Sequence, residues 1–216
     1  KKIFKKNYIK NFFKKLLKVK LNKTVLFSSV VPKAYKEIKK YLSSKKLKVL
    51  EVKNLRIKQI LKVRIKNFKQ LGSDRISNSV GALQFKNCLI IDFGTATTFD
   101  IVKNYIYEGG VISPGIKLSI LNLNKSTALL PLLNIKNIQK SYGKNTQEAL
   151  NAGFIWGYEG LINNIIQKII KKTNVNFKII LTGGYAKLFK KHIKKKTIID
   201  QNITIKGIAK ILKELV

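Results

Sequence analysis

Several residue types are scarce in this chain, and their scarcity limits the kinds of protein it can be. Its 216 residues include no methionine, one cysteine, one histidine and three prolines. The lone cysteine, Cys88, excludes a framework of intrachain disulfides and is typical of a reducing compartment, so we expect a cytoplasmic protein. Because methionine is absent, the sequence starts without an initiator residue, and we expect a longer natural chain upstream of Lys1.

Long apolar runs are missing as well. No stretch reaches the roughly 20 apolar residues of a membrane-spanning helix, and no uncharged segment near the start is long enough for a signal peptide. Apolar residues between Ile3 and Leu17 recur at helical spacing, with lysines between them. This pattern fits a helix on a membrane surface or, as we prefer, a helix docked on a sheet with its lysines in solvent. We expect no membrane partner.

Acidic residues are few, and the formal net charge is +35. Such a charge is common in proteins that bind nucleic acid. Arginine, however, occurs only at positions 56, 64 and 75. Proteins that recognise bases and phosphates favour arginine, because its guanidinium group can donate two parallel hydrogen bonds. Lysine, isoleucine and asparagine are abundant together, as codon usage in an AT-rich genome produces. We expect no specific nucleic-acid partner, and a basic nucleic-acid-binding module remains a minor alternative.

The apolar pattern predicts an α/β fold in two units, with 45% hydrophobic residues to build one good core or two small ones. In the first unit, residues 24–31 and 48–52 are expected to be strands on either side of a helix at 34–42. A connector over residues 55–71 leads to a helix at 76–83.

The second unit is expected to begin with three sequential strands, at residues 88–92, 97–102 and 105–112. A helix follows Pro114, and a long helix runs from Asn145, which forms a capping box with Glu148. The remaining expected elements are a strand at 177–181, a helix from 186, a short strand from 200 and a helix from 208.

Three of the four aspartates lie between residues 74 and 100. Asp92 ends an apolar run and is followed at once by Gly94 and Thr95. A buried strand that delivers these residue types at its end presents a carboxylate, backbone N–H groups and a hydroxyl at one point, and these groups can hold a metal–phosphate. Taken alone, the same turn could be a structural hairpin.

Other segments are ambiguous in the same way. Asp74 and Arg75 form either a structural ion pair or a base beside an anion anchor. Gly183 and Gly184 form either a turn that faces a nucleotide or a purely structural turn between a strand and a helix. Thr146 could simply help to cap its helix.

The order of these segments resembles the type III pantothenate kinases, a family within the actin/hexokinase/Hsp70-like ATPase superfamily. The resemblance covers the chain from about residue 24 to its end. The matching segments are Ser28-Ser29-Val30-Val31-Pro32, Gly72-Ser73-Asp74-Arg75 with Asn78, Asp92-Phe93-Gly94-Thr95-Ala96-Thr97-Thr98-Phe99-Asp100, Gly109-Gly110-Val111-Ile112-Ser113-Pro114-Gly115, Thr127-Ala128-Leu129-Leu130-Pro131, Gly143-Lys144-Asn145-Thr146 and Thr182-Gly183-Gly184.

The resemblance implies a two-domain actin-like ATPase (ribonuclease H-like) fold, with an incomplete N-terminal domain at residues 1–85 and a C-terminal domain at 86–216. It implies ATP-dependent phosphorylation of pantothenate to 4′-phosphopantothenate, the first step of coenzyme A biosynthesis. The expected cofactors are ATP, Mg²⁺ and K⁺ or NH₄⁺, and the expected assembly is a homodimer. The alternative is a non-catalytic regulatory or degraded relative on the same fold.

On the substrate side, the resemblance implies that Asp74 is the general base. It also implies that Gly72, Ser73, Asp74, Arg75 and Thr146 contact pantothenate, with Arg75 a partner for the carboxylate.

On the nucleotide side, the resemblance implies that Asp92 binds the monovalent cation and that Thr95 contacts the ATP phosphates. Gly183 and Gly184 would lie near the adenosine. Asp100 is expected to be a structural strand residue.

The chain departs from the family pattern at several positions. The family opens with an Asp-x-Gly-Asn-Thr turn that grips the ATP phosphates, and no such turn occurs in residues 1–23. We therefore expect the leading strands of the first domain to be missing from this sequence. Ile65 and Phe68 stand where tyrosine and proline are common, and Ser73 stands where alanine is usual. Loss of the tyrosine hydroxyl is expected to weaken pantothenate binding.

Overall fold

The computed structural model describes residues 24–135 and 141–216, so the amphipathic segment at residues 3–17 lies outside the described residues. By its internal contacts the chain divides into two compact units. The first comprises residues 1–62, 66–81 and 204–216, and the second comprises residues 63–65 and 82–203. The predicted domains of residues 1–85 and 86–216 differ from these units mainly in the last 13 residues, which have their contacts in the first unit.

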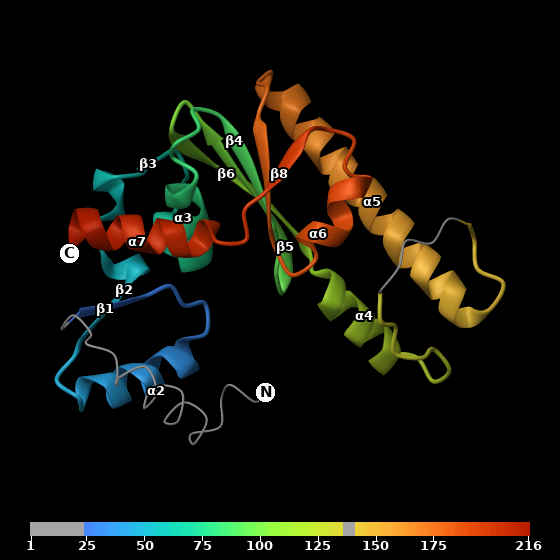
Figure 1. The fold of residues 1–216 in the computed structure, drawn as a ribbon, viewed down its shortest axis with the longest axis horizontal. Coiled ribbons are helices and arrows are strands. Elements are labelled where there is room, and N and C mark those ends of the chain that lie inside the picture. Colours follow the sequence, from blue (N-terminus) through green and yellow to red (C-terminus); the bar gives the residue numbers. More distant parts are fainter. Residues whose placement is uncertain (1–23, 136–140) are drawn as a thin grey trace. The chain divides into compact units, whose positions relative to one another are not determined.

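The described part of the first unit begins with a parallel pair of strands joined by a helix (Figure 1). Strand β1 (Thr24–Phe27) pairs with β2 (Lys48–Glu51), and Phe27 lies opposite Glu51. Helix α2 (Pro32–Ser43) makes the crossover that parallel strands require, and Pro32 occupies its first turn, where a missing N–H costs nothing. The predicted strand–helix–strand order is confirmed.

The rest of the first unit is helical. The segment after β2 contains three short 3-10 helices, η2 (Val52–Asn54), η3 (Ile57–Gln59) and η4 (Phe68–Gln70), of which η3 and η4 lie within the predicted connector. Helix α3 (Ser73–Gly81) starts three residues earlier than predicted, because the turn of residues 72–75 is itself helical. Helix α7 (Ile203–Leu215) packs on α3 so closely that a Cβ at Gly207 would overlap the carbonyl oxygen of Ser77. The hydroxyl of Thr204 also donates to Asn78 Oδ1 at 2.6 Å.

The second unit is built on a six-stranded sheet in the order β3-β6-β5-β4-β7-β8. Strands β4, β5 and β6 form an antiparallel meander, whereas β7 runs parallel to β4 and β8 parallel to β7. The strands are β3 (Lys62–Val63), β4 (Cys88–Phe93), β5 (Ala96–Lys103), β6 (Ile106–Pro114), β7 (Lys178–Gly183) and β8 (Thr197–Ile199). The predicted mixed α/β fold is confirmed, with its meander first and its parallel strands after the helices.

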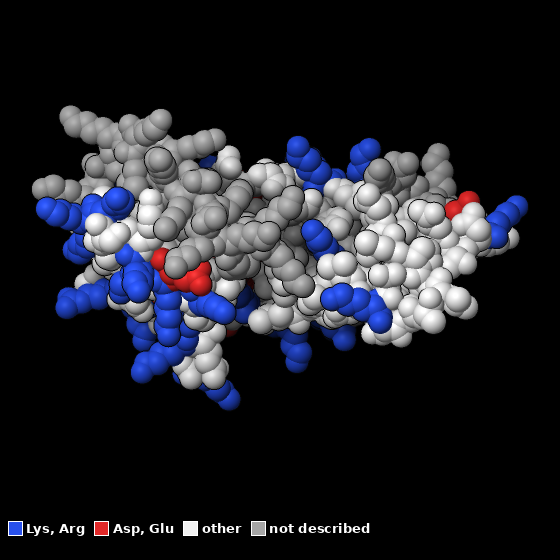
Figure 2. All heavy atoms as spheres, turned by 90° about the horizontal axis from the view of Figure 1, so that it is seen from below, with Lys and Arg blue, Asp and Glu red and all other residues white. Residues whose placement is uncertain are grey.

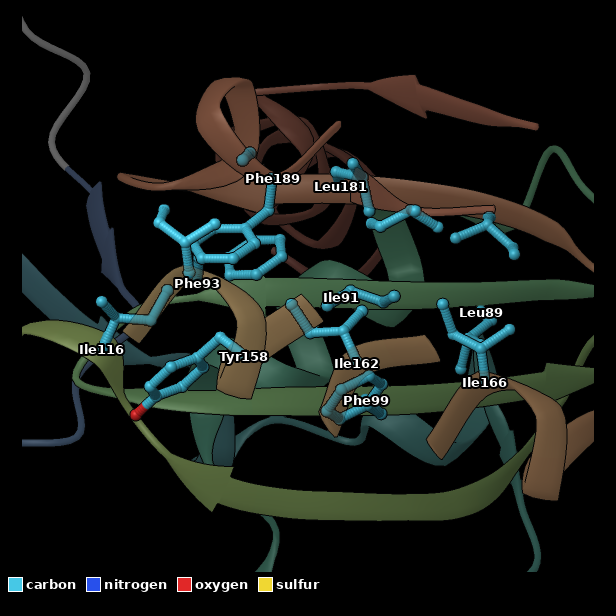
Figure 3. Close-up of a cluster of buried hydrophobic side chains, with 14 of the residues drawn as sticks. Leu89, Ile91, Phe93, Phe99, Ile116, Tyr158, Ile162, Ile166, Leu181 and Phe189 are labelled. Carbon is cyan, nitrogen blue, oxygen red and sulfur yellow. The ribbon is translucent and has the colours of Figure 1, made fainter. Parts of the chain in front are cut away.

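The core of this unit lies between the sheet and helix α5 (Thr146–Thr173), with α4 (Ile116–Lys125) and α6 (Ala186–Phe189) around it (Figure 3). Alternate residues of β4 supply Leu89, Ile91 and Phe93 to this side. The ring of Phe189 stacks on that of Phe93 with centroids 5.7 Å apart. Each such buried side chain contributes about 1.5–3 kcal/mol of transfer free energy.

The end of the second unit differs from the prediction. The short strand expected from Asp200 is wrong: β8 ends at Ile199, and Asp200 begins a turn. Its carboxylate accepts from the backbone N–H of Asn202 at 3.0 Å, and its carbonyl accepts from that of Ile203 at 3.5 Å. Helix α7 follows this turn and begins at Ile203 rather than at Ile208.

The surface is rich in lysine. On the face drawn in Figure 2, lysine and arginine side chains stand at many separate points, with few acidic side chains among them. Across residues 24–135 and 141–216, no helix is both long and apolar enough to cross a membrane.

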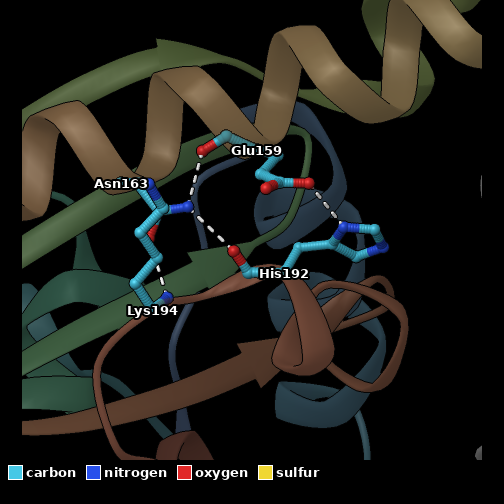
Figure 4. A network of polar contacts seen from close by, with 4 residues as sticks. All are labelled: Glu159, Asn163, His192 and Lys194. Atoms are coloured by element: carbon cyan, nitrogen blue, oxygen red, sulfur yellow. Dashed lines mark hydrogen bonds and ion pairs between the residues drawn. The ribbon is translucent and has the colours of Figure 1, made fainter.

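A polar clamp ties α5 to the segment after α6 (Figure 4). The buried side chain of Asn163 donates to the carbonyl oxygens of Glu159 and His192, and its oxygen accepts from the backbone N–H of Lys194. One turn away, Glu159 Oε2 lies 2.7 Å from His192 Nδ1. The clamp includes the 3-10 helix η5 (Lys190–His192) and fixes the course of the chain between β7 and β8.

We expect the substitution Asn163→Ala to lower the free energy of unfolding by about 1–3 kcal/mol, because it removes the partly buried hydrogen bonds of the Asn163 side chain to the Lys194 N–H and the His192 carbonyl. Urea denaturation measures this change. The exposed neighbour Asn164 provides the matched control, and Asn164→Ala should change stability by no more than about 0.5 kcal/mol. Equal effects of the two variants would contradict the role of the clamp.

Candidate active site

Asp92 lies near the end of β4, a strand that is paired on both sides. Its neighbours in register are Thr98 of β5 and Thr182 of β7, so a carboxylate and two threonines lie side by side across three strands. Both threonines are buried and Asp92 is half-buried. Directly after β4 the chain turns, with Gly94 N–H donating to the carbonyl of Ala96 at 3.1 Å, and Thr95 is exposed at the tip of the turn.

The glycine turn after β7 lies against this strand end. Gly183 has a φ of +85°, and a Cβ there would lie 2.6 Å from Asp92 Oδ1 and 2.7 Å from the backbone of Phe93. The N–H of Gly184 donates to the carbonyl of Phe93 at 3.1 Å. The structure therefore brings together the four predicted nucleotide-side residues, Asp92, Thr95, Gly183 and Gly184.

A second close approach backs the turn at Thr95. Gly115, at the start of α4, lies so near this turn that a Cβ on it would overlap the carbonyl of Thr95. The hydroxyl of Tyr158, on α5, reaches the same region and lies 2.7 Å from Ser119 Oγ, one turn into α4. Burial raises the pKa of Tyr158, and its hydrogen bond to Ser119 lowers it by less. The turn is thus supported by packed backbone rather than by flexible side chains.

The predicted substrate residues 72–75 lie in the first unit, at the N-terminal end of α3. The carboxylate of Asp74 is in the first helical turn, and its Oδ1 accepts from the backbone N–H of Arg75 at 2.8 Å. A Cβ at Gly72 would collide with this same oxygen, so a larger residue there would displace the carboxylate from this position. Ser73 is buried, and Arg75 is half-buried.

A cavity of about 610 Å³ adjoins Gly72 and Ser73 within the first unit. Its other walls come from the turn after β1, one face of α2 and the end of β2. They include Tyr35, Glu51 and three lysines, at positions 36, 39 and 53. Burial, and to a smaller extent the charge of Glu51, raises the pKa of Tyr35. Sequence reasoning missed Glu51, because it lies 22 residues from Ser73 in the chain and shares no motif with it.

Thr146 lies elsewhere, at the first position of α5 in the second unit. It does not cap its helix, since Asn145 Oδ1 accepts from Glu148 N–H and Glu148 in turn accepts from the N–H of Lys144, both at 2.9 Å. The predicted pairing of Asn145 with Glu148 is confirmed, although the Glu148 carboxylate binds the N–H of Lys144 and not that of Asn145. Thr146 instead lines an apolar groove of about 530 Å³ between α4 and α5, in which Ser119 and Tyr158 are the other polar side chains.

Asp100 is fully buried on β5 and accepts a hydrogen bond from Tyr107 Oη at 2.9 Å. Burial, and then the charge of Asp100, raises the pKa of the Cys88 thiol to about 12. These contacts fit a structural strand residue. Within the described part of the chain, no group of three or more His, Cys, Asp or Glu side chains is placed to hold a metal ion. Any cation at Asp92 would therefore depend on that one carboxylate, neighbouring oxygens and the nucleotide phosphates.

The family model for type III pantothenate kinases matches residues 4–168. The chain belongs to this family. A type III pantothenate kinase of Pelagibacter ubique is 45% identical over 194 residues, which cover 89% of this chain and 78% of the relative. One from Persephonella marina is 36% identical, over 86% of this chain and 74% of the relative.

A solved structure shows the same fold. A conserved Baf family protein of Campylobacter jejuni superposes with a TM-score of 0.64 at 24% identity, over 94% of this chain and 87% of the other.

Two departures from the type III pantothenate kinase pattern have structural contacts of their own. Ile65 packs 3.7 Å from the Cβ position of Gly109, and Lys58 Nζ lies 5.9 Å from the ring centre of Phe68.

The glycine turn allows a direct test. We expect Gly183→Ala to lower the free energy of unfolding by about 1–3 kcal/mol, because alanine is strained at this φ and its Cβ would press on Asp92. Gly184, next in sequence, has open space around its Cβ position. Gly184→Ala should therefore cost less than about 1 kcal/mol in the same urea titration. A Gly183→Ala variant as stable as Gly184→Ala would show that the turn is not this close to β4.

Proposed function

We propose that this protein transfers the γ-phosphoryl group of ATP to the primary hydroxyl of pantothenate, giving 4′-phosphopantothenate for coenzyme A biosynthesis. Family membership supports the reaction, and one observation carries it: Asp92, Thr95 and the glycine turn meet at one end of the second-unit sheet. A carboxylate, a hydroxyl and tightly packed backbone at one strand end suit a nucleotide phosphate site.

In the second unit, the residues proposed to bind the nucleotide mainly position charge. We assign Thr95 to the ATP phosphates, because its hydroxyl is exposed at the tip of the turn after β4. We assign Gly183 and Gly184 to the adenosine end, where the absence of side chains permits a close approach. Bound Mg²⁺ would neutralise charge on the phosphate oxygens. K⁺ or NH₄⁺ would be held by Asp92, beside the buried threonines 98 and 182.

In the acceptor half, Asp74 is the proposed general base. One carboxylate oxygen is held by the N–H of Arg75, so the orientation of the carboxylate is set before substrate binds. The carboxylate takes the proton of the pantothenate hydroxyl while the hydroxyl oxygen forms a bond to the γ-phosphorus. The bond between the γ-phosphorus and the oxygen of the β-phosphate breaks at the same time, and ADP is released. Gly72, Ser73 and Arg75 line the pantothenate site, and Arg75 pairs with the pantothenate carboxylate.

We further propose that the protein works in the cytoplasm as a homodimer, with Thr146 contacting pantothenate. The groove that contains Thr146 is mostly apolar, and large apolar side chains near it are exposed, among them Leu118, Leu123 and Leu129. On α5, three glycines at positions 153, 157 and 160 have open space around their Cβ positions. A second copy of the chain could cover this surface.

The base assignment has a direct test. We expect Asp74→Asn to lower kcat for formation of 4′-phosphopantothenate by about 10²–10⁴-fold, because the amide cannot take the hydroxyl proton while it can still accept from Arg75 N–H. Production of ADP that depends on pantothenate measures this rate. Glu37→Gln, at an exposed acid on α2, should leave the rate unchanged. An unaltered rate for Asp74→Asn would reject the assignment. A full-length natural protein without turnover would favour a non-catalytic relative.

The cation assignment is tested separately. At constant ionic strength, replacing Na⁺ by K⁺ or NH₄⁺ should raise kcat/KM for ATP several-fold. The substitution Asp92→Asn should remove this response, because a neutral amide holds a monovalent cation poorly. Turnover that is indifferent to the choice of cation in the wild-type chain would argue against the role given to Asp92.

A further inference from the structure

Glu51 is an acid with no assigned part in the reaction, and it lies beside the turn that carries Asp74. It ends strand β2 opposite Phe27, and the next residues form η2, which packs against α3. Its side chain is half-buried and lines the cavity that adjoins Gly72 and Ser73. An acid in this position is held by strand pairing rather than by a loop.

The Glu51 carboxylate reaches the start of α3. Its Oε1 lies 3.5 Å from Ser73 Oγ, at the outer limit of a hydrogen bond. Ser73 is the first residue of α3 and is only 1% exposed, so its hydroxyl has little access to water. A carboxylate near a helix N-terminus is also favoured by the helix dipole.

Ser73 transmits this contact to the proposed base. Its own carbonyl accepts from Ser77 Oγ at 2.8 Å, which fixes it in the first turn of α3. The next residue is Asp74, and the direction of its carboxylate depends on how this first turn is oriented. A small rotation of the turn would move the carboxylate relative to the hydroxyl that it must deprotonate, and reaction rates are sensitive to such displacements.

We propose that Glu51 is a positioning residue for Asp74 that acts through the hydroxyl of Ser73. This proposal rests on the proposed function, in which Asp74 is the base. Three lysines, at positions 36, 39 and 53, line the same cavity as Glu51. Glu51 is not assigned a catalytic role.

A double-mutant cycle tests the proposal in the full chain. We expect Glu51→Ala and Ser73→Ala each to lower kcat about fivefold while KM for ATP stays unchanged. The double variant should lose no more than either single variant, because both substitutions remove the same contact. Glu51→Gln keeps an acceptor oxygen and should recover most of the rate, and Glu37→Ala, on the exposed face of α2, should have no effect.

A second measurement does not depend on turnover. Amide hydrogen exchange in the first turn of α3 should become faster to the same extent in Glu51→Ala, Ser73→Ala and the double variant. Additive losses of kcat, or exchange rates equal to those of the wild type, would overturn the proposal. If the full-length natural protein shows no turnover but exchange responds as expected, the contact stands and the proposed function fails.

Discussion

The arrangement of the second unit depends on the double pairing of strand β4. Because β4 is paired with β5 on one side and β7 on the other, the register of both ladders places threonines next to Asp92. The parallel pairing also brings the turn at Gly183 to the same end of the sheet as the turn at Gly94. The close approach of Gly183 to Asp92 and Phe93 follows from this pairing, and a side chain at residue 183 would disturb it.

Features encoded by local patterns were predictable from the sequence. The apolar run of residues 88–91 gave a buried strand, and the pairing of Asn145 with Glu148 gave the start of α5. The meeting of Asp92 with the glycine turn at Gly183 could be expected from the order of the motifs, because parallel strands end at the same edge of a sheet. Here local sequence and long-range packing agree.

Other features depend on contacts between distant residues and could not be predicted in this way. Asp200 reads as part of a strand until its carboxylate is seen to accept from Asn202. Nothing in the local sequence indicates that Glu51 faces Ser73, or that Glu159 faces His192, 33 residues away. Thr146 matched a substrate motif, yet its side chain lines a groove formed by α4 and α5, whose geometry only the fold determines. Ionic and polar contacts carry no periodicity, and this explains why pattern-based reasoning missed them.

Because acidic residues are scarce, each contact made by an acidic side chain matters for the structure. The chain has 10 acidic residues and 45 basic ones. Most lysines therefore have no acidic residue available as a partner. Several of the acids make short contacts that fix local geometry: Asp200 before α7, Glu148 at the start of α5, Glu159 in the clamp to His192, and Asp100 beside Tyr107. Long-range attraction between the surface charges is weak at cellular salt, because the screening length is about 8 Å. Short contacts of single acids therefore determine specific geometry in this protein, whereas the excess of lysine adds charge without fixing a particular contact.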